Sequence, residues 1–149
     1  MQRVIISYVL EGEFMQPVTQ VAPVSSRTLW AGRIISALPV VILLVNGAMK
    51  VMKAPVAVEG SIQLGYPEKV VLAIGVVLLV CTLLYVIPQT SILGAILLTG
   101  YLGGAIATHV RVGNPLFTHI LFPVYVGVMV WGGLFLRDKR LRALVPLRR

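Results

Sequence analysis

Four long apolar runs without a charged residue occupy most of the chain after residue 33, and they constrain the fold more than any other feature. The runs are Ile34–Met49, Val70–Ile87, Ser91–Thr108 and Leu116–Leu136. A helix that crosses a bilayer needs about 20 mostly apolar residues, so each run is close to the length of one span. The first run is slightly short, but Arg33 and Lys50 flank it and can extend their charges to the lipid headgroups.

The composition also indicates a membrane protein. Hydrophobic residues make up 58% of the 149 residues, and charged residues make up 12%. That charged share is roughly half of the value for a soluble domain. The net charge of +8 comes from residues at the predicted helix ends, so we expect contact with the lipid bilayer and no nucleic-acid binding. The single cysteine, Cys81, can form no intrachain disulfide and is interpreted as a small buried apolar side chain.

We therefore predict an all-α fold, an integral membrane four-helix bundle with antiparallel spans. The first helix begins near Arg27–Trp30, and Pro39 and Pro123 are expected to kink the first and last spans. The longest connection, Ala54–Tyr66, could contain a short interfacial helix. We divide the chain into an N-terminal tail, residues 1–27, and a four-helix domain, residues 28–149, which ends in a basic tail.

The distribution of lysine and arginine predicts the orientation. An even number of spans places both termini on one side of the membrane, and that side carries the larger number of cations. Cytoplasmic segments are enriched in Lys and Arg, so we expect the N and C termini in the cytoplasm. The cations on the side of the termini are Arg3, Arg27, Arg33, Arg137, Lys139, Arg140, Arg142, Arg148 and Arg149, and those on the outer side are Lys50, Lys53, Lys69 and Arg111.

The third apolar run contains two adjacent stripes of small residues that recur every four positions. Small residues allow helices to approach closely in lipid. The pattern therefore predicts a set of helix-packing residues: Gly100, Gly103, Gly104, Ala107 and Thr108. The alternative is that Gly103 and Gly104 leave room for a cavity between helices.

Polar side chains are expected together at the outer ends of the spans. Asn46 and Lys50 are four residues apart and share one helix face. His109 and His119 are equidistant from Asn114, the middle of their hairpin, and should lie at similar depth. Ionisable groups at membrane depth are costly, so a cluster of them predicts a functional site. The candidate ligand-binding residues are Asn46, Lys50, Tyr101, His109, Arg111 and His119.

A second interpretation needs no ligand. Lys50 and Arg111 can extend to the headgroups, and His109 can stabilise the carboxyl end of its helix.

Two histidines could also ligate a metal or a haem, but no third histidine or Cys-x-x-Cys-His motif accompanies them, so neither is expected. A quinone or another apolar ligand fits better, with Tyr101 lining its pocket. No nucleophile–base pair, Walker loop or dinucleotide motif is present, so catalytic residues stay unassigned.

Several segments together have a distinctive pattern, of which the longest is residues 93–111, with residues 31–36, 46–50, 64–67 and 87–90 beside it. Over about residues 28–149 the chain resembles the DoxX-like family of small bacterial membrane proteins. The resemblance implies a four-helix protein of the bacterial plasma (inner) membrane. Relatives include a subunit of a thiosulfate:quinone oxidoreductase and a partner in a thiol-linked oxidative-stress complex. The chain differs from many relatives at Asn46, where they carry an acid, and at Gln89, where they carry arginine.

Three functions remain open at this point. The first is an accessory subunit in membrane redox or stress metabolism that contacts quinone, at most one subunit of an oxidoreductase. The second is an oligomeric subunit that binds or transports a small molecule or lipid. The third is a structural scaffold without a ligand, which packs against itself or a membrane partner subunit.

Overall fold

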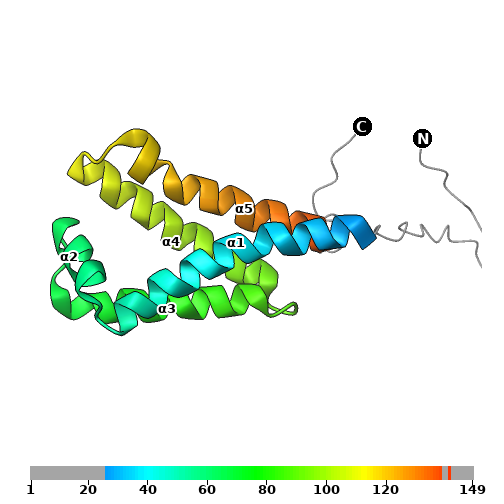
Figure 1. Ribbon diagram of the computed structural model, residues 1–149, viewed down its shortest axis with the longest axis horizontal. Coiled ribbons are helices and arrows are strands. Elements are labelled where there is room, and N and C mark those ends of the chain that lie inside the picture. Colours follow the sequence, from blue (N-terminus) through cyan, green and yellow to red (C-terminus); the bar gives the residue numbers. More distant parts are fainter. Residues whose placement is uncertain (1–25, 139–140, 142–149) are drawn as a thin grey trace, which may run out of the picture.

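The computed structural model of the protein describes residues 26–138 and residue 141. Within them the chain forms five α-helices and one π-helical turn, and it contains no β-strand (Figure 1). The predicted N-terminal tail and basic C-terminal tail lie almost entirely outside the described residues. The elements are α1 (Ser26–Val51), α2 (Pro55–Gln63), α3 (Glu68–Val86), α4 (Ser91–Val112), η1 (Leu116–Ile120) and α5 (Phe122–Arg137).

Four stretches are long and apolar enough to cross a membrane: α1, α3, α4 and the continuous segment Leu116–Arg137. In each, only 22–33% of the most apolar window is buried within the protein. Large apolar side chains instead face outward, including Ile34 (66% exposed), Leu83 (55%) and Val128 (67%). Exposed apolar surface of this extent, on helices that satisfy their own backbone hydrogen bonds, is typical of contact with lipid. The predicted all-helical class with four apolar spans is confirmed.

The four long helices contact one another in a closed ring. α1 packs against α3 and α5, and α4 packs against the same two helices. In Figure 1, α1 and α4 run from right to left, and α3 and α5 run back. The α1–α3 pair and the α4–α5 pair are close at the right and diverge toward the end that carries α2 and η1. The long helices are therefore closer together at one end of the protein than at the other.

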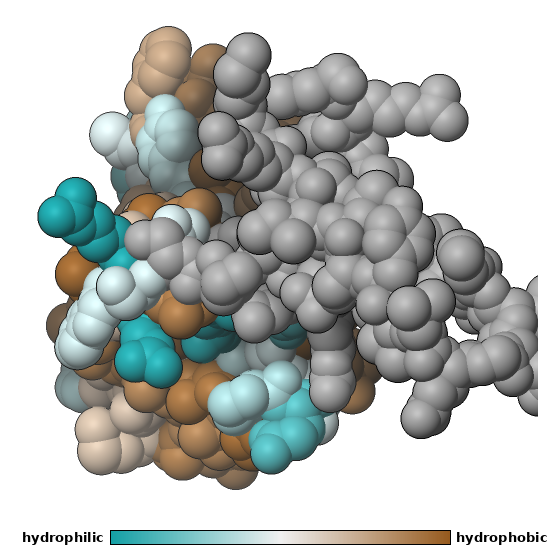
Figure 2. All heavy atoms as spheres, turned by 90° about the vertical axis from the view of Figure 1, so that its right-hand side faces the viewer, coloured by the Kyte–Doolittle hydropathy of each residue, from teal (hydrophilic) through white to brown (hydrophobic). Residues whose placement is uncertain are grey.

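Tyr85 occupies the centre of the tightly packed end. It is fully buried, and its hydroxyl hydrogen-bonds the Val130 carbonyl at 2.9 Å and the Ser36 hydroxyl at 3.0 Å, which joins α3 to α5 and α1. Arg137 donates to the Tyr85 carbonyl at 3.1 Å, and its guanidinium lies 4.7 Å from the Tyr85 ring centroid. Figure 2 views this end of the protein, where hydrophilic side chains lie among apolar ones.

Glycines mark the closest approaches between long helices. A Cβ on Gly94 of α4 would lie 2.5 Å from the Tyr85 Cα of α3, a distance that no real side chain tolerates. A Cβ on Gly32 of α1 would lie 2.9 Å from the Leu136 Cβ of α5. A Cβ on Gly75 of α3 would lie 3.0 Å from the Val51 backbone nitrogen of α1. Small residues thus bring the helices together as they do in lipid generally.

The last span is not one regular helix, and Pro123 explains why. A proline has no N–H to donate and clashes with the carbonyl four residues earlier, which here belongs to His119. The chain first forms the π-helical turn η1, in which the Leu121 amide donates to the Leu116 carbonyl at 2.9 Å, and then enters α5. By contrast, α1 continues through Pro39, which is buried against the rest of the protein.

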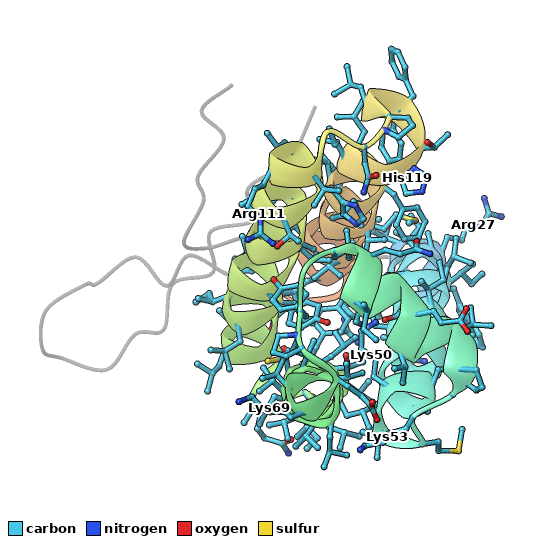
Figure 3. All side chains as sticks on the ribbon, turned by 90° about the vertical axis from the view of Figure 1, so that its left-hand side faces the viewer. Arg27, Lys50, Lys53, Lys69, Arg111 and His119 are labelled. Atoms are coloured by element: carbon cyan, nitrogen blue, oxygen red, sulfur yellow. The ribbon has the colours of Figure 1, made fainter. Side chains whose placement is uncertain are left out.

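The long connection between α1 and α3 contains the expected short helix, α2. The chain turns into it at Lys53, which has a φ of 51°, and leaves it through Gly65, at a φ of 83°. Pro67 then adopts an extended conformation as the N-cap of α3, one position before the helix. These turns place α2 across the open end of the four long helices, as Figure 3 shows from that end.

Candidate functional site

A large cavity lies between the diverging ends of the long helices. Its volume is about 810 Å³, and α1, α3, α4 and α5 all contribute to its walls, with α2 and His119 of η1 at the open end. The walls are mostly apolar and include Leu43, Leu78, Leu102 and Val126. A mostly apolar cavity of several hundred cubic ångströms with a few polar groups is typical of small-molecule sites. We call it the interhelical cavity.

Asn46 and Lys50 reach the interhelical cavity from α1. Their four-residue spacing places them on one helix face, and the Lys50 ammonium donates to Asn46 Oδ1 at 2.6 Å. Lys50 is half-buried. In Figure 3 it lies behind α2 within the ring of long helices, whereas Lys53 and Lys69 lie at the periphery.

His109 and His119 reach the cavity from α4 and η1. Their ring centroids are 5.7 Å apart, which agrees with the similar depth expected from the hairpin. The left-handed conformation of Gly113 ends α4 and turns the chain back, so that the Asn114 amide donates to His109 Nδ1 at 2.8 Å. Neutral His109 then carries its proton on Nε2. His119 is exposed, and its Nδ1 lies 2.8 Å from the Thr118 hydroxyl oxygen.

Tyr101 lines the same cavity, deeper along α4. It lies two turns before His109 on the same helix face and packs against the core. Its side chain is half-buried, and its hydroxyl has no hydrogen-bond partner among residues 26–138. A phenol that packs against a core and also borders a cavity can present its hydroxyl to a bound molecule.

Arg111 does not line the cavity, so the structure separates it from the other five candidates. Its guanidinium donates to the Leu64 carbonyl at 2.7 Å, which fixes the end of α2 to α4. Nearby, the Thr108 hydroxyl donates to the Gly104 carbonyl at 2.8 Å and therefore accepts the hydrogen bond from the Tyr66 hydroxyl, also 2.8 Å away. These two contacts hold the α2–α3 connection against α4. The sequence patterns gave no role to Tyr66, because such a pairing joins residues far apart in the chain.

The small residues of α4 separate into three environments. Gly100 and Gly104 line the cavity, and a Cβ at either would meet no atom within 4 Å. Gly103 and Ala107 are exposed, and a Cβ at Gly103 is equally free of contacts within the described chain. Thr108 is buried. Within the chain, the closest approaches between helices occur at Gly94 and at glycines of the other helices. The stripe faces partly into the cavity and partly outward, so close packing of its outward residues against a second helix stays a prediction.

The two histidines are not joined by further metal ligands. In the described part of the chain, no group of three or more His, Cys, Asp or Glu side chains could hold a metal ion. Glu68 instead pairs with Lys53 at 3.7 Å on the surface, and Glu59 is exposed on α2. Of the described residues that line the cavity, none is an aspartate or a glutamate.

Four membrane-span helices around a cavity with polar residues at one end define a multi-pass membrane protein. The chain belongs to the DoxX-like family, whose model matches residues 34–133. The match includes α3, α4 and most of α1 and α5, together with every candidate residue of the site. No curated protein and no solved structure matches the chain.

Proposed function

We propose that this protein binds an amphipathic small molecule in the interhelical cavity. The observation that carries this proposal is that five side chains from three elements, predicted as a cluster from the sequence, line one cavity of about 810 Å³: Asn46, Lys50, Tyr101, His109 and His119. The polar head of the molecule would lie among these groups. Its apolar part would lie against the aliphatic walls, of which Leu43 and Leu78 are members.

A quinone is one molecule of this kind, and it would connect the cavity with redox metabolism. Its carbonyl oxygens accept hydrogen bonds, which Lys50 Nζ, the Tyr101 hydroxyl and the Nε2–H of neutral His109 can donate. In this form of the proposal the protein is an accessory subunit in membrane redox or stress metabolism, as the family resemblance suggested. The chain would supply the binding site, and a partner would supply the chemistry.

We further propose that the four long helices cross the bacterial inner membrane as an antiparallel bundle with both termini in the cytoplasm. The supporting observation is the excess of Lys and Arg around the two ends of the chain. The interhelical cavity would then open toward the outer side of the membrane. Protease cleavage of a tag on the C terminus should occur in inside-out vesicles and not in intact cells.

The test of ligand binding uses two variants of adjacent glycines. Gly104→Leu places a side chain into the cavity, whereas Gly103→Leu makes the same chemical change outside it. Each protein is purified in a mild detergent, and the bound molecules are extracted and identified by absorbance and mass spectrometry. We expect wild type and Gly103→Leu to retain a quinone or lipid in a fixed ratio to protein, and Gly104→Leu to lose it. Wild type without a stoichiometric ligand, or equal retention in Gly104→Leu, would refute the proposal.

The same variants test the scaffold and oligomer hypotheses. Gly103 and Ala107 are exposed side by side on α4, one turn apart, where a second helix could approach closely. If this face joins two copies or a partner subunit, crosslinking in membranes should weaken in Gly103→Leu and persist in Gly104→Leu. Transport would also need such an assembly, since four helices are few for a transporter.

A further inference from the structure

The charges that face the interhelical cavity are unbalanced. Among the described residues that line it, Lys50 is the one side chain with a permanent charge, His109 and His119 are bases, and none is an aspartate or glutamate. The end of the protein that carries α2 has two acidic residues, Glu59 and Glu68, but both are exposed and neither lines the cavity. A charge that is removed from water without a counter-ion is costly.

Lys50 has a neutral partner where a counter-ion would be expected. Its ammonium has three donors, and the one side-chain acceptor found for it among residues 26–138 is the amide oxygen of Asn46 at 2.6 Å. The neighbouring cations are satisfied elsewhere: Lys53 lies 3.7 Å from Glu68, and Arg111 donates to a backbone carbonyl. Lys50 therefore differs from them in facing a mostly apolar cavity with its charge unpaired.

We infer that the molecule bound in the interhelical cavity carries a negatively charged head, for which Lys50 is the counter-ion. The inference rests on the proposed function and adds the charge of the ligand to it. Asn46 orients the ammonium, and His109, whose Nδ1 is occupied by Asn114, presents its Nε2–H as a second donor. A carboxylate or phosphate on an apolar chain satisfies both donors, because charge-assisted hydrogen bonds are the stronger ones.

The apolar walls of the cavity favour a ligand with an apolar chain over a small free anion. The cavity extends from Lys50 along α1 and α3 to Leu43 and Leu78, both almost fully buried in the core. On α4, the absence of a side chain at Gly100 and Gly104 keeps the space open over one further turn. A head without an apolar chain would leave this surface without contacts, so the ligand class is an anionic amphiphile.

The test compares probes that share an apolar chain and differ in the charge of the head. Purified full-length protein in uncharged detergent is titrated with a pyrene-labelled fatty acid and with its methyl ester, and binding is read from energy transfer between tryptophan and pyrene. A second pair, pyrene-labelled phosphatidylglycerol and phosphatidylcholine, distinguishes a lipid headgroup from a free carboxylate. Acetate is added as a competitor that has a head and no chain. The variants are Lys50→Gln and, as a matched control of a surface lysine, Lys53→Gln.

We expect wild type and Lys53→Gln to bind at least one anionic probe about ten- to one hundred-fold more tightly than its uncharged or zwitterionic partner. In Lys50→Gln this ratio should fall to near one, while the methyl ester binds as it does to wild type. Acetate should not compete. Equal binding of acid and ester to wild type, or an unchanged ratio in Lys50→Gln, would overturn the inference but leave the cavity as a binding site. Failure of every probe to bind wild type would also overturn the inference, whereas the proposed function fails only if purified wild type retains no ligand in a fixed ratio to protein.

Discussion

The same substitution at two glycines of α4 should change stability in opposite directions. Gly94 and Gly104 both lie on α4, so Gly→Ala alters the unfolded chain similarly at each. A Cβ at Gly104 meets no atom within 4 Å, whereas one at Gly94 would lie 2.5 Å from Tyr85 Cα and 2.7 Å from the Leu84 carbonyl carbon. Those atoms belong to the backbone of α3 and cannot rotate away. The two helices must therefore separate.

The magnitude follows from that separation. Carbon atoms in contact prefer about 3.5 Å or more, so α3 and α4 must move apart by about 1 Å, which weakens contacts along their interface. Overpacking of this kind costs about 1–3 kcal/mol. Gly104→Ala gains at most about 1 kcal/mol from the higher helix propensity of alanine. The same propensity gain applies to Gly94→Ala, so the two variants should differ by the overpacking cost, about 1–3 kcal/mol in the free energy of unfolding.

Unfolding in mixed micelles measures this difference. The protein in mild detergent is titrated with sodium dodecyl sulfate, and tryptophan fluorescence and helicity are followed. Trp131 is a suitable reporter, since its indole donates to the Thr99 hydroxyl at 2.8 Å across the α4–α5 contact. Gly94→Ala should unfold at a lower detergent fraction than wild type, and Gly104→Ala at the same or a higher one. If both unfold together, the close contact of α3 with α4 is wrong.

Two further predictions concern the hydrogen bonds that join the helices. Tyr85→Phe removes a hydroxyl that joins three helices, and it opens no cavity. Hydrogen bonds between membrane helices contribute about 0.6 kcal/mol on average, so we expect the free energy of unfolding to fall by about 1 kcal/mol in the same titration. An unchanged free energy would contradict the role assigned to Tyr85. The double variant Tyr66→Phe and Arg111→Gln removes the two contacts that hold the α2–α3 connection on α4. Amide hydrogen exchange should therefore become faster in α2 and keep its wild-type rate in α3. An exchange rate in α2 equal to that of wild type would show that other contacts hold this helix.

Much of the site was predictable because its signals are local. Asn46 and Lys50 share a helix face at a spacing of four, and the hairpin about Asn114 sets His109 and His119 at one depth. These relations depend only on helix periodicity and chain direction. The resemblance to the DoxX-like family likewise rests on contiguous segments, and it agrees with the family match over residues 34–133.

The sequence by itself determined the class of protein, since hydropathy and helix length are properties of contiguous residues and lipid permits few other folds. The sequence did not determine the rotation of each helix about its own axis, and so it did not determine which residues face the cavity. Only the tertiary structure placed Gly104 on the cavity and Gly103 outside it, moved Arg111 away from the site, and brought α2 and Tyr66 onto α4. The reason is physical: in lipid, the rotation of a helix is set by close packing at particular residues such as Gly94, and those contacts join positions that no short pattern connects.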